Sequence, residues 1–140
     1  MENNTIRIII AGSRDFTDYE KLKRETDNIL QKHVFLKGLF NNCKIEIVCG
    51  MARGADLLGK RYAEEKSYLV KCFPAKWDLY GKCAGYMRNE DMAQYASAKK
   101  GYGALIAFWD GKSKGTKHMI DLANEYGLKV FLPIEKGAYK

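Results

Sequence analysis

Short apolar runs recur along the chain and alternate with segments of helical spacing. The run at residues 6–11, IRIIIA, is nearly continuous and β-branched, which is typical of a central parallel strand covered on both faces. We predict four further strands, at residues 45–49, 68–73, 104–109 and 128–132. The segments between these runs are long enough to return the chain to the same end of a parallel sheet.

Helix signals fill most of the intervening segments. Thr17 and Glu20 have the spacing of a capping box, so a helix is expected to start near Asp18. Gly127 is expected to be the C-cap of the last helix. The further helices are expected from Ala55 to about Lys66, from about Arg88 to Ala98, and from about 116 to 126.

Three segments carry little periodicity. Residues 38–43 are expected to form a loop, and residues 133–140 a short tail. Residues 74–87, PAKWDLYGKCAGYM, hold two glycines and several large aromatic side chains. This composition predicts a long functional loop or lid that leads into the helix at about Arg88.

Strands and helices alternate without a composition break or an internal repeat. A length of 140 residues with 46% hydrophobic residues suits one domain with its own core. We therefore predict that residues 1–140 form a single Rossmann-like, doubly wound α/β domain. Its mainly parallel sheet would have about five strands, with helices on both faces.

Charge and the chain's first residues narrow the choice of partner and compartment. The net charge of +7 and the pI near 9.2 favour anionic partners, among them nucleotides and nucleic acid. No apolar run approaches the roughly 18–20 residues of a membrane span. The N-terminus lacks the basic region and cleavage site of a signal peptide. We expect no membrane partner and a cytoplasmic location.

Cysteine and histidine spacing carries no metal signature. The four Cys contain no C-x-x-C pair, and the chain has two His. Cys49 and Cys72 lie in apolar runs, so they are expected to be buried free thiols in a reducing compartment. No metal ligands are therefore expected.

The segment 45–62, IEIVCGMARGADLLGKRY, predicts a buried strand, a glycine turn and a helix start. The free N–H groups of a helix's first turn and its dipole favour bound anions. Arg53 would add a charge-assisted contact to a phosphate, and Asp56 would accept from a sugar hydroxyl. The alternative is that Asp56 complements the helix dipole and that Arg53 is solvated.

Three glycine loops are expected to gather at one edge of the sheet, because the loops after parallel strands meet there. They are Gly12–Asp15, Gly50–Asp56 and Asp110–His118. We expect them to build a basic crevice for a phosphorylated ligand with an aromatic base. The expected cations and aromatic surfaces are Arg14, Arg53, Lys112, Lys114, Lys117, Trp77, Tyr80 and Trp109.

Several common sites are absent from these loops. Gly115-Thr116-Lys117 has the wrong order for a Walker A ending, and no G-x-G-x-x-G follows the first strand. Ser13 or Ser113 with His118 would supply two members of a catalytic triad, but Ser113 lacks the context of a nucleophile elbow. The sequence thus gives little support to an ordinary NTPase, dehydrogenase or serine hydrolase.

The loop sequences resemble the YspA-like branch of the SLOG superfamily, which joins the DNA-processing protein DprA (Smf) to the LOG nucleotide hydrolases. The resemblance covers nearly the whole chain. The matching stretches are Gly12–Phe16, Val48–Asp56, Trp77-Asp78, Tyr80–Lys82, Gly85, Arg88-Asn89, Met92, Ala107–Gly111 and Ser113–Thr116.

The resemblance implies a Rossmann-like fold that holds a nucleotide, an NAD-derived molecule or ADP-ribose at the three glycine loops. It also implies a bacterial or phage source and, since SLOG relatives pair, a homodimer. The expected ligand-binding residues are Gly12, Ser13, Arg14, Asp15, Gly50, Ala52, Arg53, Gly54, Asp56, Trp77, Tyr80, Arg88, Asn89, Trp109, Asp110, Gly111, Ser113, Gly115 and Thr116.

Two relatives suggest sharper activities. LOG-type phosphoribohydrolases carry a catalytic Glu in the Gly-Thr loop, whereas the corresponding position here is Met119. Asp121 lies about 200° round a helix from that position and is a poor substitute. DprA has a turn like Gly50–Asp56 and binds single-stranded DNA.

Three functions stay open at this stage. A small-ligand module, acting as a sensor, would place phosphates on the arginines and the Gly115 loop. An enzyme would cleave a glycosidic or phosphate bond of a nucleotide and needs a carboxylate. A single-stranded nucleic-acid binder would combine positive charge with aromatic side chains. The candidate catalytic carboxylates are Asp15, Asp56, Asp110 and Asp121.

Overall fold

Five parallel strands form one sheet in the computed structural model, which describes residues 4–34 and 43–133. The strand order is β3-β2-β1-β4-β5, so the chain starts in the middle and winds outward in both directions. This confirms the predicted doubly wound, Rossmann-like α/β fold. The strands are β1 (Asn4–Gly12), β2 (Cys43–Cys49), β3 (Leu69–Cys72), β4 (Gly103–Phe108) and β5 (Lys129–Phe131).

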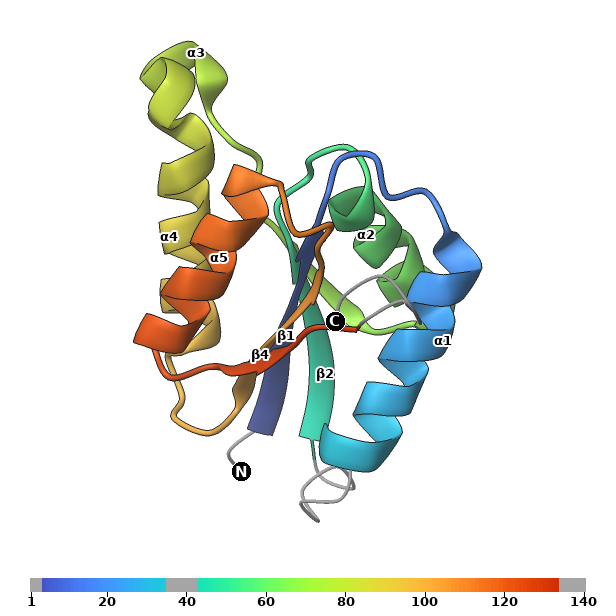
Figure 1. Ribbon diagram of the computed structural model, residues 1–140. Coiled ribbons are helices and arrows are strands. Elements are labelled where there is room, and N and C mark those ends of the chain that lie inside the picture. The colour runs from blue at the N-terminus through green and yellow to red at the C-terminus, as the bar shows by residue number, and fades with distance from the viewer. Residues whose placement is uncertain (1–3, 35–42, 134–140) are drawn as a thin grey trace.

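Helices cover both faces of the sheet (Figure 1). The helices α1 and α2 lie on one face, and α4 and α5 lie side by side on the other. A short helix, α3, stands beyond the end of the sheet, above α4 in Figure 1. The helices are α1 (Tyr19–Ile29), the π-helical turn η1 (Leu30–Val34), α2 (Ala55–Lys66), α3 (Trp77–Tyr80), the 3₁₀ turn η4 (Gly81–Cys83), α4 (Ala84–Ala96) and α5 (Lys114–Glu125).

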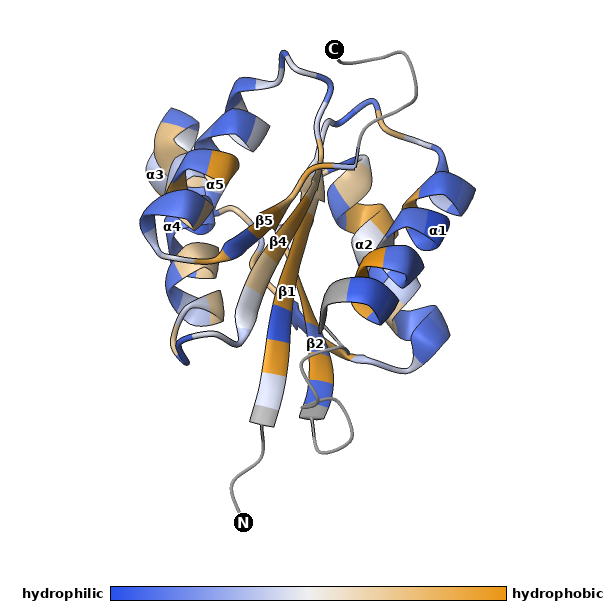
Figure 2. Ribbon diagram, turned by 60° about the horizontal axis from the view of Figure 1, so that its bottom comes forward, coloured by the Kyte–Doolittle hydropathy of each residue, from blue (hydrophilic) through white to orange (hydrophobic). Residues whose placement is uncertain are grey.

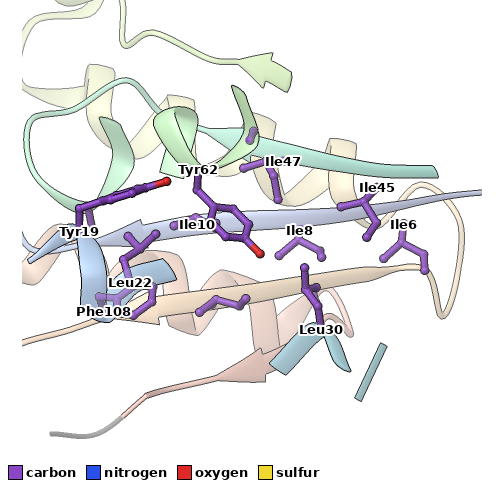
Figure 3. Packing of buried hydrophobic residues seen from close by; sticks show 14 residues of the cluster. Ile6, Ile8, Ile10, Tyr19, Leu22, Leu30, Ile45, Ile47, Tyr62 and Phe108 are labelled. Carbon is purple, nitrogen blue, oxygen red and sulfur yellow. The ribbon is translucent and has the colours of Figure 1, made fainter. Parts of the chain in front are cut away.

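The core follows from the alternation of side chains along the central strands. Ile8 and Ile10 point toward α1 and α2, where they meet Leu22 and Tyr62 (Figure 3). Ile9 points to the other face and packs with residues of α4 and α5. Figure 2 shows the result, with apolar strands between helices whose outer surfaces are polar. A strand that is buried on both faces needs apolar residues at successive positions, as Ile8, Ile9, Ile10 and Ala11 of the predicted run supply.

The predicted loop at residues 74–87 is wrong for most of its length. The chain forms α3 and η4 there, and α4 begins at Ala84 rather than near Arg88. No residue of α3 is buried, so its side chains show no apolar periodicity from which a helix could be predicted. Gly81, with a φ of +53°, separates α3 from the helical segment that follows.

The other boundaries were predicted to within a few residues. The N-cap of α1 is Asp18, whose carboxylate accepts from the Lys21 amide at 3.0 Å, and not Thr17 of the predicted capping box. The C-cap of α5 is Tyr126 rather than the predicted Gly127, which follows it with the positive φ of +79° typical of a glycine just past a helix end. The loop predicted at 38–43 lies outside the described residues except for Cys43, which begins β2, and the predicted tail is described only at Pro133.

Candidate functional site

The loops after β1 and β4 are joined at the carboxyl edge of the sheet. The Ser13 amide donates to the Phe108 carbonyl at 3.1 Å, and the Asp110 amide donates to Ser13 Oγ at 3.2 Å. Gly12 pairs with Phe108 in the ladder. The strand order reverses between these two strands, which is where open α/β sheets bind their ligands.

The loop between β2 and α2 joins the same edge through close backbone contacts. The Ala55 amide donates to the Ser13 carbonyl at 3.3 Å, and Arg53 Nε donates to the Arg14 carbonyl at 3.5 Å. Gly54 has a φ of +89°, and a Cβ at this position would lie 2.3 Å from the Ser13 oxygen. This position therefore accepts only glycine, and the β1 and β2 loops lie against each other.

Asp56, in the first turn of α2, is the buried carboxylate of this edge, with 5% of its surface exposed. Its Oδ2 accepts from the Ala52 amide at 3.4 Å. Burial raises the pKa of the Asp56 carboxyl to about 6. The charge of Arg88 and the hydrogen bonds from the amides of Ala52 and Gly12 lower the pKa, but burial has the larger effect. Asp56 therefore changes its charge close to neutral pH.

Helix α4 links the β2 loop to the β4 loop through Arg88 and Asn89. Arg88 Nη1 donates to the Gly50 carbonyl, and its Nε donates to Asn89 Oδ1 at 2.9 Å. Asn89 Nδ2 donates to the Gly115 carbonyl at 3.3 Å and lies 3.1 Å from His118 Nδ1. Since the amide nitrogen is a donor, His118 Nδ1 accepts, and burial lowers the pKa of its ring.

Gly50 lies between the buried Asp56 and the half-buried Arg88. A Cβ at this position would come within 2.6 Å of Arg88 Nη1 and 2.8 Å of Asp56 Oδ2. The missing side chain allows the guanidinium and the carboxylate to approach the same piece of backbone. The pKa of Arg88 is lowered by burial, while the charge of Asp56 raises it.

The loop before α5 is held by its own side chains. Asp110 Oδ1 accepts from the amides of Lys112 and Ser113, both at 2.8 Å. These two hydrogen bonds hold the pKa of Asp110 below its usual value, and the bond from Lys112 has the larger effect. Ser113 is the N-cap of α5 and accepts from the Thr116 amide at 3.3 Å. Asp110 thus shapes this loop, and Gly111 allows the turn with a φ of +82°.

Two adjoining cavities open at this edge. The larger holds about 650 Å³, and the narrower recess about 70 Å³. Arg14, Ala52 and Arg88 line both of them. The remaining wall of the larger cavity is formed by Gly50, Met51, Arg53, Pro74, Ala75 and Trp77. The remaining wall of the recess is formed by Ala11, Gly12, Asp56, Asn89, Ser113, Gly115, Thr116 and Met119.

The recess brings together residues of all three predicted loops and of α4. Five wall residues of the two cavities were not predicted from the sequence, namely Ala11, Met51, Pro74, Ala75 and Met119. Pro74 and Ala75 follow the carboxyl end of β3, so the rule that placed the other loops at this edge would also have found them.

The three predicted aromatic surfaces do not share one cavity. Trp77, 50% exposed, lines the larger cavity, whereas Tyr80 lines a separate cavity of about 440 Å³. Trp109 is half-buried against the core, and its indole N–H donates to the Ser113 carbonyl at 3.0 Å. Trp109 lines none of these three cavities. Of the three, Trp77 is thus placed to meet a ligand of this edge.

Several predicted charges lie on the surface around the site. Arg53 and Asp15 are exposed and pair at 3.8 Å. Lys117 pairs with Asp121 at 3.0 Å, one turn along α5, and both are exposed. The predicted lysines Lys112, Lys114 and Lys117 line none of these cavities.

Met119 is the residue that the resemblance places where LOG-type enzymes have their catalytic Glu. It is buried, with 1% of its surface exposed, and it lines the recess. Asp121 is exposed on α5 and engages Lys117, so it supplies no carboxylate to the recess. The recess therefore takes its carboxylate from Asp56 on α2.

Within residues 4–34 and 43–133, no helix has both the length and the apolarity that crossing a membrane requires. Across the same residues, no three or more His, Cys, Asp and Glu side chains gather in a group that could hold a metal ion.

Comparison with known proteins places the chain in a family. A family model described as the YspA, cpYpsA-related SLOG family matches residues 6–80. The Gene 61 protein of Mycobacterium phage D29 is 30% identical over 129 residues, which cover 89% of this chain and 93% of the phage protein. No solved structure gave a significant match. The predicted resemblance is confirmed, and the chain belongs to the YspA, cpYpsA-related SLOG family.

Proposed function

We propose that the chain binds a nucleotide-derived ligand, such as a nucleotide, an NAD-derived molecule or ADP-ribose, and acts as its sensor. One observation carries the proposal. A cavity of about 650 Å³ lies over the glycine turn Gly50–Gly54 and adjoins a recess that ends at the buried Asp56. Family membership is consistent with binding or processing of a nucleotide-related ligand.

Three arginines would neutralise the ligand's phosphates. Arg14 and Arg88 line both cavities, and Arg53 lines the larger one. The side chain of Arg53 is 74% exposed, and its 3.8 Å ion pair with Asp15 is exposed and therefore weak, so the guanidinium can turn toward a bound phosphate. An arginine gives two parallel hydrogen bonds to a phosphate, and the start of α2 adds its dipole.

Trp77 and Asp56 would recognise the two other parts of such a ligand. The half-exposed indole of Trp77 presents a flat surface in the larger cavity, and stacking on an aromatic ring contributes roughly 1–3 kcal/mol per base. The recess is too small for a base and admits a sugar hydroxyl or a single phosphate group. Asp56 at its wall would accept from a hydroxyl.

Calorimetry with AMP, ADP, NAD⁺ and ADP-ribose tests the proposal. We expect binding tighter than about 1 mM for at least one of them. Trp77→Ala and Arg53→Ala should each weaken it, because they remove the stacking surface and a phosphate contact. Lys117→Ala is the matched control, because this exposed cation of α5 lines neither cavity. Two results would count against the site. One is that none of the four ligands binds, and the other is that the unchanged chain and its three variants bind equally well.

A second candidate, processing of the bound nucleotide, is favoured by Asp56 alone. A carboxyl with a pKa of about 6 is suited to donate or accept a proton near neutral pH. Incubation of the chain with AMP, NAD⁺ and ADP-ribose, followed by chromatography, would show a base or phosphate released. Asp56→Asn should abolish this turnover and retain ligand binding. If products form equally well with Asp56→Asn, Asp56 has no catalytic part.

A further inference from the structure

Three sulfur atoms meet where β2 and β3 end. Cys49 and Cys72 are directly opposite in the parallel ladder, so their side chains lie on the same face of the sheet. Their Sγ atoms are 3.8 Å apart. The Sδ of Met51 lies 4.0 Å from Cys49 Sγ. These two cysteines are 23 positions apart in the chain, so their spacing shows no metal-binding motif, and no metal site was expected from the sequence.

The position of Met51 depends on an uncommon backbone conformation. Met51 has a φ of +64°, a region that side chains other than Asn, Asp and Gly rarely adopt. In the described part of the chain, Ser67 is the other such residue, and it ends α2. Met51 ends no helix, and its conformation brings the thioether back to Cys49. Backbone strain of this kind is concentrated at functional sites.

Two thiols and a thioether form a soft donor set. Soft sulfur ligands select Cu(I), whereas protein zinc sites use Cys, His, Asp and Glu rather than Met. A metal that binds three sulfurs in a plane at about 2.3 Å holds them about 4 Å apart. The two spacings from Cys49 Sγ, 3.8 Å to Cys72 Sγ and 4.0 Å to Met51 Sδ, match two sides of such a triangle. We propose that Cys49, Met51 and Cys72 form a three-sulfur site for one Cu(I) ion.

Cavities border the three-sulfur site on two sides. Cys49 itself is fully buried. Cys72 is half-buried and lines the cavity of about 440 Å³, and Met51 is half-buried and lines the cavity of about 650 Å³. The site is built from neither the arginines nor Trp77, so it does not depend on the proposed nucleotide function.

Binding exchanges two protons for one copper ion. When Cu(I) enters, the two S–H bonds break, two Cu–S bonds form, and both protons pass to solvent. The thioether of Met51 donates a lone pair and releases no proton. Copper stays in the monovalent state, so no oxidant or reductant is needed.

An anaerobic titration with Cu(I), in competition with a chromophoric Cu(I) chelator, tests the site. The protein should carry Cys43→Ser and Cys83→Ser, so that Cys49 and Cys72 are its two remaining cysteines. We expect one Cu(I) per chain, two protons released per ion, and three sulfur neighbours at about 2.3 Å in the copper X-ray absorption spectrum.

Two milder variants keep the test independent of folding, because replacement of the fully buried Cys49 endangers the core. Met51→Leu keeps the volume and should reduce the sulfur neighbours from three to two, with two protons still released. Cys72→Ser should weaken Cu(I) binding by roughly tenfold or more and halve the proton release. Circular dichroism verifies that both variants fold. Failure of the starting protein to compete for Cu(I), or an unchanged sulfur count in Met51→Leu, would overturn the proposal.

Discussion

The interior of the sheet and its carboxyl edge are built on different principles. Ile8, Ile9 and Ile10 have no exposed surface and contact apolar side chains on both faces. Two residues further along the same strand, the edge begins. Of the six buried polar or charged residues in the described part of the chain, four lie at this edge: Ser13, Asp56, Asn89 and Thr116.

The difference shows how stability and function are divided. Burial of apolar groups stabilises the fold, whereas a buried polar group costs free energy unless it is hydrogen-bonded. At the edge, Asp56 accepts hydrogen bonds from backbone amides of the β1 and β2 loops, and Asn89 donates one to a backbone carbonyl at the start of α5. The edge is thus ordered by polar contacts that also leave charged groups facing a cavity. Substitutions in the two regions should therefore have different consequences.

The largest expected effect is that of Ile8→Ala in the interior. Removing three carbons from a fully buried side chain should lower the free energy of unfolding by about 2–5 kcal/mol, measured by urea denaturation. Nucleotide binding by the folded fraction should be unchanged, because Ile8 lies away from both cavities. A loss below about 1 kcal/mol would mean that the interior around Ile8 is not close-packed.

Asp56→Asn should change the pH dependence of stability. The pKa of Asp56 is about 6 in the folded chain, against an ordinary value of 3.8. As the pH rises, the unfolded chain loses this proton first, so stability falls between about pH 4 and pH 6 and stays lowered above that range. The difference of about two pKa units corresponds to roughly 3 kcal/mol.

The asparagine variant lacks this titration, so its unfolding free energy should fall less between pH 4 and pH 7. Urea denaturation of both proteins across that range checks the difference. Parallel pH profiles for the two proteins would contradict the assignment of a buried, high-pKa carboxyl to Asp56.

Gly54→Ala should separate close approach from backbone strain. The new Cβ would lie 2.3 Å from the Ser13 carbonyl, in addition to the strain of a positive φ. We expect a loss of roughly 1–3 kcal/mol together with weaker nucleotide binding. Gly81→Ala is the matched control, since Gly81 also has a positive φ but no neighbour within 4 Å of the added carbon. This control should cost about 1 kcal/mol and leave binding intact. Equal effects of the two changes would contradict the interlocked loops.

The smallest effect is expected on the outer surface. Lys117→Ala breaks an exposed pair with Asp121 and should change the unfolding free energy by less than about 0.5 kcal/mol. Thermal unfolding at low and high salt measures it. A larger, salt-dependent change would show that surface charges outside the edge contribute to the fold.

The sequence predicts the interior better than the edge. Each predicted apolar run became a strand, and in β1 and β4 burial on both faces leaves a local and continuous signal. The glycine turn at residues 50–54 was also visible, since a strand, glycines and a helix start follow one another directly. Helix α3 was missed, because a helix without a buried face has no periodicity to read.

Contacts between distant segments explain the rest. Arg88 and Asn89 entered the predicted site through the family resemblance, since nothing in their neighbourhood along the chain shows that they reach Gly50 and Gly115. Trp109 was predicted to stack on a base, but its indole N–H engages the loop before α5. Whether an aromatic residue at a strand end faces the core or a ligand depends on the neighbouring elements.

Nuclear magnetic resonance of the ¹⁵N-labelled chain, titrated with AMP and ADP-ribose, tests the central claim most directly. We expect amide shift changes at Gly12, at residues 50–53, and at Ser113, Gly115 and Thr116, because these residues line the two cavities of the carboxyl edge. Amides of Thr5, Lys44 and Gly103, at the opposite ends of β1, β2 and β4, should stay unchanged. Shift changes confined to that opposite edge, or none with either ligand at millimolar concentration, would contradict it.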